Sequence, residues 1–94
     1  YSELLSYTGT NNDSNLQQNA LERLMNLKIY NEAVFKSLAY GTGNHRWQFV
    51  KFSKDTIRKL IKEPQYREIF VKIMDDLPIR EKTQLQRLLD ENRN

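Results

Sequence analysis

Side chains able to do acid–base or metal chemistry are scarce in this chain. It contains one histidine, His45, and no cysteine. A catalytic or metal-binding histidine needs an orienting acid and a nucleophile, or further metal ligands. His45 follows a Gly43-Asn44 turn and precedes Arg46, with none of these partners close in the sequence. We therefore expect a surface or helix-end role for His45.

Two further motifs have the residue types of an active site without its spacing. Asp75 and Asp76 are adjacent, and adjacent side chains of a helix point about 100° apart. We expect them to serve capping and solvation next to Pro78. The segment 41–43, Gly-Thr-Gly, lacks the further glycines and the lysine of a phosphate-binding loop, so a turn is predicted. The sequence predicts a protein that is not an enzyme, with no metal, other cofactor or small-molecule substrate.

Positive charge is concentrated in the middle of the chain. Overall there are 15 lysines and arginines against 12 acidic residues, a net charge of +3. Residues 45–72, called the basic block below, hold eight lysines and arginines but only three acidic residues. Such an uneven distribution bears on the choice of partners rather than on the fold. The basic block indicates a surface that attracts anionic partners.

The spacing within the basic block suits phosphate contacts. Four basic residues follow one another at steps of three, four and four: Lys51, Lys54, Arg58 and Lys62. If a helix started early enough, their side chains would form one stripe opposite Ile57 and Leu60, and such stripes contact phosphates. The candidate nucleic-acid contacts are Arg46, Lys51, Lys54, Arg58 and Lys62. The alternative is a solvated face, partly neutralised by Asp55 with Lys59 and Glu68 with Lys72. A helix-turn-helix is disfavoured because the helix after Pro64 is strongly apolar.

The stretch 53–77 predicts two helices hinged at Pro64. Pro64 suits the first position of the second helix, and it pushes Glu63 out of helical conformation. Ser53 is the predicted N-cap of the first helix, with Asp55 in its first turn. The apolar stripe of the second helix consists of Tyr66, Ile69, Phe70, Ile73, Met74 and Leu77.

Helices are also predicted on both sides of this pair. One starts at Asp13 or Ser14, and Asn31 could cap a second, with a break at 26–30 slightly preferred over one long helix. Gly41 is predicted as a left-handed C-cap, and 45–52 as an irregular or short helical connector whose aromatics plug the core. A last amphipathic helix follows Pro78. The sum is an all-α fold, a small four- to five-helix bundle with short turns.

The predicted organisation is a flexible or docking lead-in, 1–14, followed by a single helical domain, 15–92. Several apolar side chains exceed what a small core needs and are candidates for a protein interface. They are Leu4, Leu5, Tyr7, Trp47, Leu85, Leu88 and Leu89. Two alternatives stay open: Trp47 could belong to the core, and the three C-terminal leucines could close their own bundle.

The leading hypothesis is a helical protein-interaction or self-association module, such as an oligomerising scaffold. The chain starts at Tyr1 rather than Met, so we expect a piece of a larger intracellular protein, nuclear or cytoplasmic. Its apolar runs are too short to cross a membrane. A protein partner or a homo-oligomer is expected. The alternative is a nucleic-acid-binding helical domain that uses the basic block, for example in DNA binding.

Overall fold

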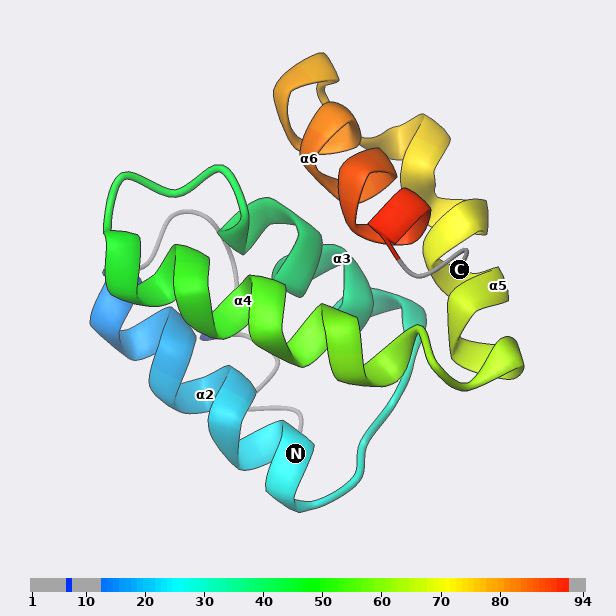
Figure 1. Cartoon of the computed structure of the whole chain (residues 1–94). Coiled ribbons are helices and arrows are strands. Elements are labelled where there is room, and N and C mark those ends of the chain that lie inside the picture. The colour runs from blue at the N-terminus through cyan, green and yellow to red at the C-terminus, as the bar shows by residue number, and fades with distance from the viewer. Residues whose placement is uncertain (1–6, 8–12, 92–94) are drawn as a thin grey trace.

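A computed structural model describes residue 7 and residues 13–91, and within them it contains five α-helices, one short 3-10 helix and no strand (Figure 1). The elements are α2 (Ser14–Asn26), α3 (Glu32–Gly41), α4 (Trp47–Leu60), α5 (Pro64–Ile73), η1 (Met74–Asp76) and α6 (Ile79–Glu91). The predicted all-α bundle is therefore confirmed.

Helix α3 lies at the centre of the bundle and contacts each of the other four α-helices. In Figure 1, α2 and α4 lie side by side along one side of α3, and α5 and α6 cover its other end. Phe35 of α3 is fully buried, and its ring stacks on that of Phe70 from α5 at a centroid distance of 4.6 Å. One continuous apolar core thus joins residues from all five helices.

The break between α2 and α3 is confirmed, and both of its ends are capped. Asn31 accepts a hydrogen bond from the backbone N–H of Val34 at 3.0 Å, as an N-cap should. At the end of α2, the N–H of Ile29 donates to the carbonyl of Leu24, which is a Schellman closure. The closure places Lys28 in left-handed conformation, with φ of 58°.

Replacing Lys28 by glycine should stabilise the fold. A left-handed residue with a side chain costs about 1–2 kcal/mol, and part of the gain is lost to the greater freedom of glycine in the unfolded chain. We expect Lys28→Gly to raise the free energy of unfolding by about 0.5–1 kcal/mol in urea titrations. The matched control is Lys54→Gly, in the middle of α4, which should lower the free energy of unfolding by about 1 kcal/mol. A destabilised Lys28→Gly variant would contradict the assigned closure.

Gly41 does not act as the predicted left-handed C-cap. It lies inside α3, Thr42 is the C-cap in right-handed conformation, and no described glycine has positive φ. The reason for glycine is close packing: a Cβ at this position would overlap the Ser53 hydroxyl of α4 and lie 3.0 Å from the Phe49 ring. Gly41 therefore lets the backbones of α3 and α4 approach each other.

The substitution Gly41→Ala should destabilise the fold by about 1–3 kcal/mol, because the added methyl group forces α3 and α4 apart. Part of this loss should be recovered in a Gly41→Ala, Ser53→Gly double variant, which removes the hydroxyl that the methyl group meets. Thermal and urea unfolding of the four proteins of this cycle measure the coupling. Strict additivity of the two substitutions would show that these positions are not in contact.

Helix α4 starts six residues before the predicted N-cap. Ser53 is fully buried in mid-helix, and the expected connector 45–52 supplies the first turns of α4 from Trp47 onward. The physical reason is that Phe49, Ser53, Ile57 and Leu60 fall on one helical face, all buried against the core. Before the helix, the Asn44 side chain accepts a hydrogen bond from the Arg46 N–H at 2.9 Å.

The Pro64 hinge is confirmed, with Pro64 in the first turn of α5 and Glu63 as its N-cap. Helix α4 ends three residues earlier than Glu63, at Leu60. Arg67 of α5 then donates a hydrogen bond to the Leu89 carbonyl of α6 at 3.1 Å, tying the last helices together.

The leucines of α6 lie inside the bundle. Leu85, Leu88 and Leu89 are at most 3% exposed and belong to the common core. Their prediction as a protein interface is therefore corrected, because the folded chain buries this face against its own helices. The alternative, in which α6 closes its own bundle, describes the structure.

Candidate functional site

The outer face of α4 carries most of the predicted nucleic-acid contacts. Lys51, Lys54 and Arg58 follow Trp47 at steps of four, three and four, which places all four side chains on one face of the helix. We call this set the α4 stripe. Trp47 is 69% exposed, so the alternative that it belongs to the core is wrong.

The two remaining candidates lie beyond the ends of the helix. Arg46 is the N-cap of α4, and its guanidinium donates to Gln48 Oε1 at 2.6 Å. Lys62 lies exposed in the turn between α4 and α5. Three of the four basic residues of the predicted stripe thus lie on one face of α4, and the fourth, Lys62, lies beyond the end of the helix.

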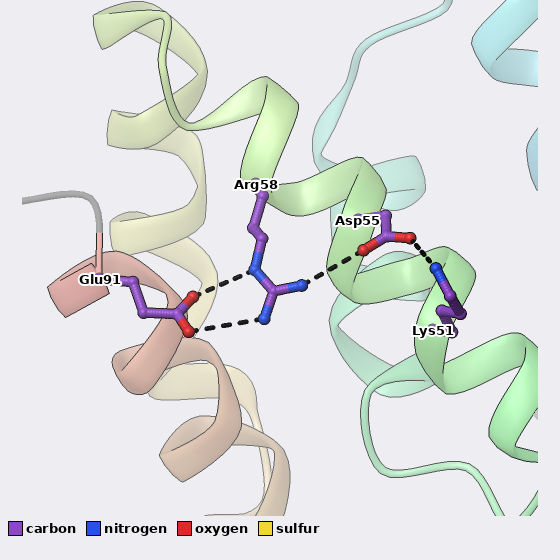
Figure 2. Close-up of polar contacts among 4 residues, drawn as sticks. All are labelled: Lys51, Asp55, Arg58 and Glu91. Carbon is purple, nitrogen blue, oxygen red and sulfur yellow. Dashed lines mark hydrogen bonds and ion pairs between the residues drawn. The ribbon is translucent and has the colours of Figure 1, made fainter.

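Two carboxylates partly neutralise the α4 stripe (Figure 2). Asp55 lies between two bases, with Lys51 Nζ at 2.8 Å and Arg58 Nη1 at 3.2 Å from its oxygens. Glu91 at the end of α6 holds the other side of Arg58, with Nε to Oε2 at 3.1 Å and Nη2 to Oε1 at 3.5 Å. Lys54 has no ion pair with any residue between 13 and 91.

The predicted neutralising pairs are wrong in their partners. Asp55 pairs with Lys51 and Arg58 rather than with Lys59. Lys72 of α5 pairs with Glu32 of α3 at 3.0 Å, rather than with Glu68. Asp55 has its partners on its own helix, four residues before it and three residues after it. Lys72 instead meets a carboxylate that tertiary packing brings from α3, and spacing along one helix cannot reveal such a partner.

Ion pairing shifts the titration of both central groups. The hydrogen bond from Lys51 lowers the pKa of Asp55 below its ordinary value of 3.8, with help from the nearby Arg58 charge. The hydrogen bond to Glu91 raises the pKa of Arg58 above its already high ordinary value. Both groups therefore stay charged at neutral pH.

The lowered pKa of Asp55 predicts a pH dependence of stability. A carboxyl whose pKa is lower in the folded state stabilises the fold above its unfolded pKa, and this is lost as the pH falls through the folded pKa. The stability difference between the wild-type chain and Asp55→Asn should therefore be constant near pH 6 and shrink below about pH 4. Urea unfolding at a series of pH values measures it, with Asp90→Asn as control. A difference that grew on acidification would contradict the assigned pairing.

A groove lies on the opposite side of α4, between this helix and α2. It encloses about 410 Å³ and is lined by Glu22, Met25, Asn26, Tyr30, Phe52, Thr56, Lys59 and Leu60. We call it the α2/α4 groove. Four of these side chains are apolar or aromatic, and Glu22 and Lys59 contribute charges of opposite sign. The arrangement can accept an apolar side chain beside a charged group.

A second, more polar pocket of about 300 Å³ lies between α3 and the start of α6. Its lining residues are Gln17, Tyr40, Gly43, Asn44, His45, Arg80 and Glu81. His45 is exposed on the loop before α4, as expected for a surface residue. Among residues 7 and 13–91, no three His, Asp or Glu side chains come close enough together to hold a metal ion.

The remaining interface candidates fare differently from the α6 leucines. Leu4 and Leu5 lie outside the described residues, and Tyr7 is half-buried. Trp47 alone combines a described position with high exposure. The α2/α4 groove was not predicted, because its walls come from segments about 30 residues apart. In the sequence, the groove was indicated only by the partly apolar pattern of α2 and by the spacing of Phe52 and Thr56 in α4.

Comparisons with family models, curated proteins and solved structures found no match to this chain. Within the described residues, no helix is both long enough and apolar enough to span a membrane.

Proposed function

We propose that this chain is a non-enzymatic protein-interaction module that binds a partner's peptide segment in the α2/α4 groove. The observation that carries the proposal is the groove itself, whose lining combines four apolar or aromatic side chains with the opposite charges of Glu22 and Lys59. The occupant is a segment with one apolar anchor side chain and a nearby acidic residue. The anchor enters the groove, and the acidic residue pairs with Lys59.

The apolar part of the groove lining is suited to an apolar anchor. Met25, Tyr30 and Phe52 are half-buried and pack against the core, so the fold supports them from behind. The Tyr30 ring meets the Tyr66 ring edge-on at a centroid distance of 5.0 Å, which limits its freedom. Met25 supplies a flexible side chain that adapts to an incoming group. The volume lies within the range of about 300–1,000 Å³ that is usual for ligand sites.

The charges at the rim favour an acidic partner. Lys59 is exposed and forms no ion pair within residues 13–91, so its ammonium is open to a carboxylate. Glu22 accepts one long hydrogen bond, from the Gln18 amide at 3.5 Å. The excess of positive charge along α4 adds a longer-range attraction for an acidic segment. Self-association through the α6 leucines is not part of this proposal, since they are buried.

Selection of short random peptides displayed on phage tests the proposal. Peptides retained by the wild-type chain should share an aromatic or aliphatic residue that lies within about four residues of an Asp or Glu. Thr56→Arg places a large side chain into the groove and should weaken a selected peptide at least about tenfold in fluorescence anisotropy. Lys59→Glu should weaken the same peptide through its acidic residue.

Matched controls separate the groove from the general surface. Thr83→Arg makes the same change on an exposed face of α6 and should leave peptide affinity unchanged. Arg87→Glu repeats the charge reversal away from the groove. The proposal fails if no peptide is enriched, or if Thr56→Arg and Thr83→Arg have equal effects. Circular dichroism spectra of all variants should show unchanged helix content.

A further inference from the structure

The α4 stripe has the composition of a surface that binds single-stranded nucleic acid. Trp47, Lys51, Lys54 and Arg58 follow one another along one helical face of about 16 Å. We propose that a nucleobase of a single strand stacks on Trp47, while the lysines and the arginine of the stripe contact the phosphate backbone. We further propose that Glu91 competes with the phosphates for Arg58. The site lies on the opposite side of α4 from the α2/α4 groove and does not depend on it.

The exposure of Trp47 points to a stacking role. Trp47 begins the same helix as Phe49, which is buried, yet its own side chain is 69% exposed. No other described aromatic ring packs on it. An exposed indole among cations is the standard element of single-strand sites, because every base offers a flat face and the adjacent cations hold the backbone.

The structure favours a single strand over a duplex. In a duplex the base faces are already stacked on one another, so Trp47 would have nothing to stack on. Major-groove reading would need an exposed polar helix after α4. The next helix is α5, and it buries Phe70 and Ile73 in the core. We therefore assign contact with nucleic acid to the α4 stripe, with Lys62 just beyond the end of the helix.

The cations of the stripe differ in how free they are. Lys54 has no ion pair within residues 13–91, and neither does Lys62 at the end of the helix. Lys51 shares Asp55 with Arg58. Lys54 is thus the cation most ready to meet a phosphate, with Lys62 extending the path of the strand.

Glu91 occupies the place on Arg58 that a phosphate would take. Two guanidinium nitrogens face its two carboxylate oxygens, and the same fork binds phosphate oxygens. The side chains of Arg58 and Glu91 are 46% and 55% exposed, so the pair can exchange with an anion from solution. Figure 2 shows this fork, with Asp55 holding the third nitrogen of Arg58.

The experiment uses the chain's single tryptophan as its reporter. Titration with an oligothymidylate at low salt should quench the fluorescence of Trp47, and anisotropy of a labelled strand should give the affinity. The affinity should fall steeply as salt rises from about 50 to 200 mM. A duplex of the same length should bind more weakly and quench less.

Paired variants separate local contacts from net charge. Lys54→Gln should weaken strand binding about fivefold and should reduce the slope of log affinity against log salt concentration by about 0.7. Lys59→Gln, on the other side of the same helix, should change the affinity less than twofold. Trp47→Ala should weaken binding about tenfold. Glu91→Gln should tighten binding about threefold, and its control Asp90→Asn should do so to a smaller extent.

Several results would overturn the proposal. One is the absence of quenching at low salt, and another is equal weakening by Lys54→Gln and Lys59→Gln, which would show attraction to net charge alone. If a duplex or polyglutamate binds as tightly as the oligothymidylate, the site is not specific for single strands. If Glu91→Gln binds no better than Asp90→Asn, the competition is wrong. Thr56→Arg blocks the groove and should not weaken strand binding, although its added positive charge should tighten it slightly, as Asp90→Asn does. Failure of the groove and failure of the stripe therefore remain distinguishable.

Discussion

The close approach of α3 and α4 at Gly41 is the constraint on which the other surfaces depend. With no side chain at Gly41, the Ser53 face of α4 lies directly against α3, and Phe49 and Ile57 are buried on either side of it. This contact fixes the rotation of α4 about its own axis. The fixed rotation decides which residues of α4 point toward α2 and which point away. The Ser53 hydroxyl finds no hydrogen-bond partner there, a cost that the tight packing offsets.

One helix consequently presents two chemically different faces. Phe52, Thr56 and Lys59 face α2 and form one wall of the α2/α4 groove. Trp47 and the bases of the α4 stripe lie on the other side, where Arg58 reaches Glu91 of α6. Both faces are rigidly supported because α4 is held by the core between them. A rotation of α4 about its axis would move both surfaces relative to the core, so neither surface can change independently of the core.

The sequence allowed prediction of those features that local chemistry determines. Asn31 and Pro64 mark helix starts through their own side chains, and both starts were predicted. The start of α4 was missed because the aromatics of 47–52 are not arranged in a clean helical stripe. Only contact with α3 and α2 shows that Phe49 is core, Phe52 half-buried and Trp47 exposed. Gly41 was misassigned for a similar reason, since glycine serves a left-handed cap and a close helix crossing equally well.

Charge in the sequence likewise differs from charge at the surface. The basic block holds an excess of positive residues, but within the described chain the fold brings carboxylates from other helices to two of them, Glu91 to Arg58 and Glu32 to Lys72. These partners lie far from the block in sequence, so composition alone overestimates the charge available to a ligand. The lysines left without ion pairs in the described chain include Lys54 and Lys59, on opposite sides of α4. Because each is at least partly exposed to solvent and forms no ion pair within residues 13–91, the charge of either face can be changed without breaking an ion pair of the fold.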